Sequence, residues 1–152
     1  MFSIFRSMQA VKVEKEPHYF RALWVAGREA EQRSVPLVEE YLLLYGALRC
    51  SIHLRNRLFH TETNLRELMI RVSNEIELNV VSHYYDPKSQ VRMGKEAKSI
   101  LRLSHKLAEE YKCEYPRVQH LLFALVQRNQ IASILAVYGI TEENIRPLLS
   151  TI

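Results

Sequence analysis

Residues 61–69 read TETNLRELM and residues 141–149 read TEENIRPLL, so one nine-residue pattern occurs twice in the chain. The two copies share Thr, Glu, Asn and Arg at the same places, and the apolar positions stay apolar where the residue differs. A pattern that recurs at a fixed distance is typical of a duplicated supersecondary unit. The sequence therefore predicts that one fold unit occurs twice.

The repeat extends upstream of this pattern. Residues 39–44 (EEYLLL) align with residues 118–123 (VQHLLF). Three small or apolar residues still further upstream have counterparts in the second copy: Leu23 and Leu101, Ala26 and Ser104, Ala30 and Ala108. These alignments place repeat one at about 19–76, a linker at about 77–94 and repeat two at about 97–152, with residues 1–14 as an extension outside the repeat.

Each copy begins with the spacing of an amphipathic helix. Small and apolar residues recur every three or four positions, which places them on one helical face. They are Phe20, Leu23, Gly27 and Ala30 in the first copy and Ile100, Leu101, Ser104, Leu107, Ala108 and Tyr111 in the second. Pro36 and Pro116 predict the starts of the second helices, because the first helical turn leaves its N–H groups without helical partners.

The last two elements of each copy are predicted to be shorter. The third elements are expected at Ile52–Leu58 and Ile131–Tyr138, and the glycine after the second of these suits a left-handed helix stop. Thr61 and Thr141 are predicted as N-caps of the fourth helices. Pro147 lies inside the last of these, where the lost hydrogen bond favours a kink or a short final turn.

The composition is typical of one compact soluble domain, with 152 residues, 47% hydrophobic and 25% charged. A chain of this length buries about 68–70% of its unfolded surface, so neither a disulfide nor a structural metal is needed. No run of about 18 apolar residues exists, and no membrane contact is expected. The first residues lack the long apolar core of a secretory signal, so a cytoplasmic location is predicted.

The net charge of +4 permits an acidic partner without requiring one. Arg49, Arg55 and Arg57 form the densest basic cluster, which is typical of a solvated face and leaves a nucleic-acid site as the alternative. Cys50 and Cys113 are too few for a disulfide framework, although a single bridge between them stays open. A reducing compartment is therefore expected.

No residue pattern indicates catalysis, a cofactor or a metal. The six histidines show no His-x-x-x-His spacing, and the cysteines show no Cys-x-x-Cys spacing. Cys113 and His120 could approach each other, but nothing places the third, orienting residue that a nucleophilic pair requires. The phosphate-binding Gly-x-x-x-x-Gly-Lys-Ser/Thr motif is absent from the sequence. We therefore expect a protein that is not an enzyme, with no cofactor.

The repeated units resemble a known family, the double Clp-N domain at the front of Clp-type AAA+ unfoldases. The resemblance rests on Ala108, the run from Gln119 to Leu125, the pair Ile134-Leu135 and the ending Tyr138-Gly139-Ile140. The first copy keeps Glu40 but has Tyr41 where the family usually has His. The resemblance implies an all-α fold of about eight helices, in which residues 1–152 form two four-helix repeats related by a pseudo-twofold axis.

The same resemblance implies a docking function. Domains of this family recruit substrate polypeptides or adaptor proteins to a Clp AAA+ ring, which is part of the same chain or a separate protein. One alternative is a stand-alone accessory protein that binds and regulates the Clp protease complex. A basic helical nucleic-acid binder is the more remote alternative, and nucleic acid is not the expected partner.

Candidate partner-binding residues follow from the family's Glu-His-Leu-Leu motif. They are Glu40, Tyr41, Gln119 and His120. Some relatives bind phosphoarginine with the Glu of each motif and with a Thr near each first helix. In this sequence the two Thr positions fall near Glu16 and Gly94. Neither of these residues has a hydroxyl, and Gln119 is not acidic, so phosphoarginine binding is not expected. Alternatively, Glu40 and Gln119 cap the first turns of the second helices.

Overall fold

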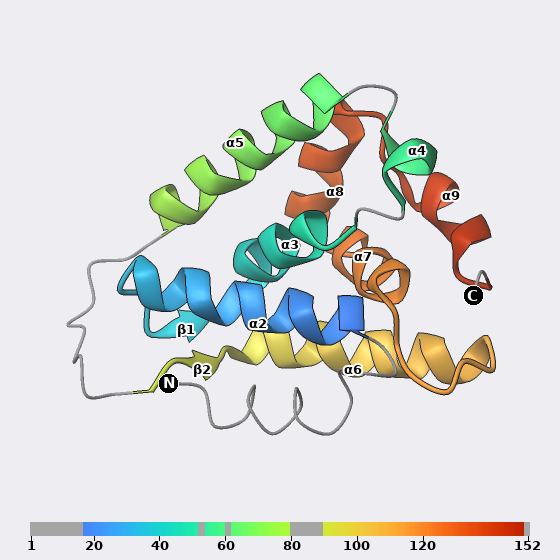
Figure 1. Ribbon diagram of the computed structural model, residues 1–152, viewed down its shortest axis with the longest axis horizontal. Helices are drawn as coiled ribbons and strands as arrows, with labels where there is room; N and C mark the ends of the chain where they lie inside the picture. Colours follow the sequence, from blue (N-terminus) through green and yellow to red (C-terminus); the bar gives the residue numbers. More distant parts are fainter. Residues whose placement is uncertain (1–16, 52–53, 60–61, 80–89, 151–152) are drawn as a thin grey trace.

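The computed structural model describes residues 17–51, 54–59, 62–79 and 90–150, and nearly all of their regular structure is helical (Figure 1). The elements in chain order are α2 (Pro17–Gln32), β1 (Leu37–Val38), α3 (Glu40–Arg49), α4 (Arg55–Leu58), α5 (Glu62–Asn79), β2 (Arg92–Met93), α6 (Lys95–Glu110), α7 (Val118–Val126), α8 (Asn129–Val137), α9 (Glu142–Ile145) and the 3-10 helix η2 (Arg146–Leu148). This confirms the all-α class that the repeat predicts.

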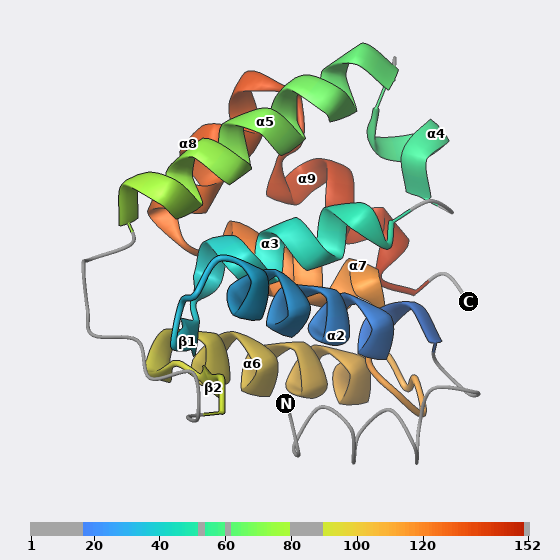
Figure 2. The same ribbon diagram turned by 60° about the vertical axis from the view of Figure 1, so that its left-hand side comes forward.

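The two halves make reciprocal contacts. Helices α3 and α7 pack against each other, while α2 of the first half contacts α7 and α6 of the second half contacts α3. The α2–α7 contact in one direction and the α6–α3 contact in the other are the equivalent pairs that a pseudo-twofold axis between the halves produces. Figures 1 and 2 show α2 and α6 side by side along one edge of the molecule, with α5 and α8 on the opposite side.

The core is centred on α3 and α7. Every residue of α7 is buried, as are seven of the ten residues of α3. Leu43 and Leu122 are 0% and 1% exposed, which agrees with their predicted place in the core. Among the described residues no single helix is long and apolar enough to cross a membrane, and α7 with α8 reaches that length only as a pair bent by 107°.

A buried hydrogen bond joins the first helices of the two halves. The hydroxyls of Tyr19 on α2 and Ser104 on α6 lie 3.1 Å apart, and both side chains are 0% exposed. Burial raises the pKa of the Tyr19 hydroxyl above its usual value of 10, so that hydroxyl stays protonated. The bond therefore satisfies two polar groups that would otherwise be costly to bury.

The helix ends repeat as well as the helices do. Ser34 after α2 and Lys112 after α6 both have a left-handed backbone, with φ of 57° and 58°. In each case the next residue donates its N–H back into the helix, Val35 to Ala30 and Cys113 to Ala108, as in a Schellman motif. Such an ending reverses the chain within a few residues, which lets the next helix return along the first.

Gly139 stops α8 in the same way. Its φ is +78°, as the predicted left-handed stop requires, and the N–H of Ile140 bonds the carbonyl of Leu135 at 3.0 Å. Thr141 then caps α9, as predicted, since its Oγ1 accepts the N–H of Asn144. The expected short final turn at Pro147 is the 3-10 helix η2.

The predicted helix starts at Pro36 and Pro116 are wrong. Helix α3 begins at Glu40 and α7 at Val118. In the first half, the carbonyl of Pro36 instead accepts the N–H of Arg92 at 3.0 Å, and the two-residue strands β1 and β2 pair in parallel. A tertiary contact therefore holds this stretch extended and delays the helix, and it adds a short strand pair that the sequence did not indicate.

Two other boundaries also differ from those expected, while the predicted start at Ile52 lies outside the described residues. Helix α8 begins two residues before the predicted Ile131. Helix α5 continues to Asn79, past the predicted end of repeat one. Thr61, residues 1–14 and most of the predicted linker lie outside the described residues.

Replacing Leu43 or Leu122 by alanine tests the register of the repeat. Each side chain is completely or almost completely buried in the central pair, so each substitution is expected to lower the free energy of unfolding by about 2–5 kcal/mol. The matched control is Val137→Ala on α8, where the side chain is 73% exposed and the expected change is below about 0.5 kcal/mol. Urea denaturation measures all three, and equal stabilities would contradict the alignment.

Candidate functional site

Acidic groups meet where α3 begins. Glu39 is the N-cap of α3 and Glu40 its first residue, and both are half-buried. Burial raises the pKa of the Glu39 carboxyl, and the charges of Glu40 and Glu96 raise it further. Burial also raises the pKa of Glu40, although the Arg128 guanidinium partly opposes the effect. Arg128 bonds Glu96 at 2.7 Å, so the starts of α3 and α6 and the end of α7 lie together.

This arrangement is unsuited to a phosphate. Gly94, near one of the places where relatives have a Thr, is the N-cap of α6. A Cβ at Gly94 would overlap the carboxylate of Glu39, which occupies the space beside it. A phosphoryl group brought to this point would face that negative charge. Glu16, near the other Thr place, lies outside the described residues.

Of the four predicted partner-binding residues, only Glu40 is more than slightly exposed. Tyr41 is 8% exposed, and its hydroxyl donates a hydrogen bond to Oε1 of Gln130 on α8 at 3.3 Å. Gln119 is 2% exposed and His120 is 0% exposed. Their role in binding stays a prediction, and the structure shows that Gln119 and His120 belong to the interior in this conformation.

His120 has a structural task at the start of α7. Its Nδ1 accepts the N–H of Arg117 at 2.9 Å, and its Nε2 donates to the carbonyl of Leu149 at 3.1 Å. The imidazole is therefore neutral and ties the C-terminal turn to α7. Cys113 approaches it, with Sγ 3.9 Å from Nε2. Because both ring nitrogens are already engaged, His120 cannot take a proton from that thiol.

The described residues contain no cluster of three or more His, Cys, Asp or Glu side chains placed to hold a metal ion. Both cysteines are free thiols, so the bridge that the sequence left open is not formed. Cys50 is buried, and this burial raises the pKa of its thiol. A buried, protonated thiol is a poor nucleophile.

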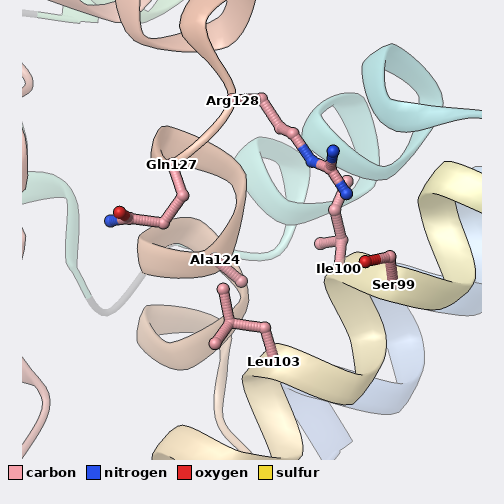
Figure 3. Close-up of a pocket in the computed structure, with 6 residues that line it drawn as sticks. All are labelled: Ser99, Ile100, Leu103, Ala124, Gln127 and Arg128. Carbon is pink, nitrogen blue, oxygen red and sulfur yellow. The ribbon is translucent and has the colours of Figure 1, made fainter.

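A hollow of about 340 Å³ lies between α6 and α7, beside the acidic groups described above. Its lining consists of Ser99, Ile100, Leu103, Ala124, Gln127 and Arg128. Figure 3 shows Leu103 and Ala124 pointing toward each other from α6 and α7, while Arg128 reaches from the end of α7 toward Ser99. We call this feature the α6–α7 groove. An apolar floor with a few polar groups at its edge is the usual make-up of a binding site.

The two halves differ in sequence at the helices that border the groove. In the first half, Gly46 on α3 lies so close to α2 that a Cβ would overlap the carbonyl of Ala22. The matched residue of α7 is Leu125, which is buried. A glycine permits a closer helix contact than a leucine does. Ala124, which lines the groove, stands where the first half has the larger Tyr45.

The sequence did not reveal this groove. The predicted site follows a motif, whereas the groove follows from the separation of two helices. A comparison of Tyr45 with Ala124 and of Gly46 with Leu125 across the repeat indicates only that the two copies differ in side-chain size here.

Removing the imidazole of His120 tests its structural role. Burial lowers the pKa of His120 below its usual 6.5, so the unfolded chain binds a proton more readily than the folded one. The neutral His120 therefore costs no stability above its unfolded pKa. As the pH falls below that pKa, protonation favours the unfolded chain and the free energy of unfolding decreases. Between about pH 7.5 and pH 5.5 this decrease is at most about 1.4 kcal/mol.

The variant His120→Asn keeps an acceptor for the Arg117 N–H, as Asn144 does for Thr141 in α9. It cannot titrate, so its unfolding free energy should fall less than that of the wild type over this pH range. Urea denaturation at both pH values gives the difference between the two profiles. Identical acid losses would show that His120 does not titrate on unfolding.

Comparison with known proteins agrees with this fold. Residues 19–138 and residues 92–151 match the family described as the Clp repeat (R) N-terminal domain. No curated protein matches the chain.

Three solved structures are similar in fold. A chain from preliminary structural investigations of a malarial protein secretion system is 19% identical, with a TM-score of 0.75 over 87% of this chain and 89% of that one. The Hsp104 N-terminal domain from Candida albicans is 16% identical, with a TM-score of 0.70 over 90% and 88%. The N-terminal domain of the ClpV1 ATPase from E. coli is 14% identical, with a TM-score of 0.59 over 94% and 88%. The family match covers most of the sequence, and the chain therefore belongs to the Clp repeat N-terminal domain family.

Proposed function

We propose that this chain is a docking domain that recruits polypeptide clients or adaptor proteins to a Clp-type AAA+ unfoldase and performs no chemistry of its own. The α6–α7 groove is the observation on which the proposal chiefly rests. Membership of the Clp repeat N-terminal domain family supports it, as does the likeness in fold to the N-terminal domains of Hsp104 and ClpV1.

The groove suits an apolar side chain of a client or adaptor. Ile100, Leu103 and Ala124 form its floor, and Ser99 with Arg128 supplies polar groups at its edge. Leu103 is only half-buried, so a bound apolar side chain would remove more of its surface from water. An interface of this modest size is expected to have a dissociation constant on the order of micromolar, as transient encounters do.

The substitution Leu103→Gln tests the groove. It replaces an apolar lining residue by a polar one of similar size, so the affinity for a permanently unfolded, dye-labelled polypeptide should fall about tenfold. Leu101→Gln is the matched control, because Leu101 lies on the same helix with similar burial but does not line the groove. Fluorescence anisotropy measures binding, and thermal melting confirms that both variants fold. Equal affinities for the two variants would contradict the proposed site.

The charge reversal Glu40→Lys tests the predicted contact at the start of α3. A basic client segment should bind more weakly, while stability should change by only about 0.5 kcal/mol because the residue is partly exposed. Glu67→Lys, at an exposed position of α5, is the control. Anisotropy with a lysine-containing peptide gives the affinities. If Glu40→Lys binds normally while a substitution elsewhere abolishes binding, Glu40 is not part of the site.

A further inference from the structure

The α6 side of the groove has an exposed basic rim. Ser99 and Leu103 line the groove from α6, and helical residues three or four positions apart lie on the same face. Lys95 and Arg102 lie four and three positions from Ser99, and Lys106 lies three positions from Leu103. All three basic side chains are exposed. We call Lys95, Arg102 and Lys106 the basic rim.

The charges of the basic rim are available to a partner. Within the described part of the chain, none of its three residues forms an ion pair. Glu96, the acidic residue of α6 nearest to the groove lining in sequence, is instead bound by Arg128 at 2.7 Å. On the far side of the groove, the charge of the Glu142 carboxylate is partly offset by Arg146 at 3.4 Å, and Gln127 donates a hydrogen bond to it at 2.9 Å.

We propose that the partner segment that occupies the α6–α7 groove is acidic. It places an apolar side chain in the groove against Leu103 and directs Asp or Glu side chains toward the basic rim. This inference rests on the proposed docking function and adds the chemistry of the client or adaptor. Exposed charge pairs add little affinity each, but complementary charge selects partners and speeds their encounter.

The apolar floor favours a protein segment over a nucleic acid. Phosphate groups could pair with Lys95, Arg102 and Lys106, but a phosphate backbone has no aliphatic group to place against Leu103. An acidic polypeptide satisfies both features at once. Glu39 and Glu40 are acidic residues at the start of α3, so the proposal places the acidic residues of the partner along α6, beside the basic rim.

Three peptides of equal length test the inference, each with one central Phe flanked by Glu, by Gln or by Lys. Anisotropy titrations with the 152-residue chain should show the Glu peptide binding about tenfold more tightly than the Lys peptide at low salt. The difference should shrink as salt screens the charges. The double variant Arg102→Glu, Lys106→Glu should abolish or reverse this order, whereas Arg66→Glu, on the exposed face of α5, should preserve it.

The variant Leu103→Gln separates this inference from the proposed function. If it weakens all three peptides while they bind the wild type equally, the groove is correct and the acidic partner is wrong. If it weakens none of them, the groove itself is wrong. A single-stranded oligonucleotide serves as competitor. If it binds more tightly than the Glu peptide and depends on Arg102 and Lys106 but not on Leu103, the partner of the basic rim is a nucleic acid and the inference fails.

Discussion

The rest of the structure depends on the burial of α7 on every side. A helix with apolar residues all round cannot face water along any edge, and all nine of its residues are buried. Helices α2, α3, α6, α8 and α9 all contact it. The central helix therefore presents an apolar surface to each of its neighbours.

Much of this arrangement could be predicted from the sequence because its causes are local. The spacing of Leu43 and Leu122, the cap at Thr141 and the stop at Gly139 each depend on a few neighbouring residues. The start of α3 could not be predicted in the same way, since the pairing of Pro36 with Arg92 joins residues far apart in the chain. The 18-residue length of α5 also exceeds that of its counterpart α9, although their opening sequences are nearly the same.

The candidate site shows the same contrast between what local sequence predicts and what long-range contacts determine. A motif can identify a position such as Glu40, but it cannot show that His120 is fully engaged by Arg117 and Leu149. A motif also reports which residues are alike, whereas the groove arises where the two copies differ. The features that distinguish one member of this family from another are therefore poorly represented in the pattern that identifies the family.

The exchange of Gly46 for Leu125 at matched positions has a consequence for how a duplicated fold diverges. The close helix contact in the first half contributes to cohesion that the whole molecule shares, because both halves cover the same central pair. The second half can then lose that contact and reshape its outer surface without unfolding the molecule. One copy of the unit can thus keep a close helix contact while the other carries a surface groove, because both copies share one core.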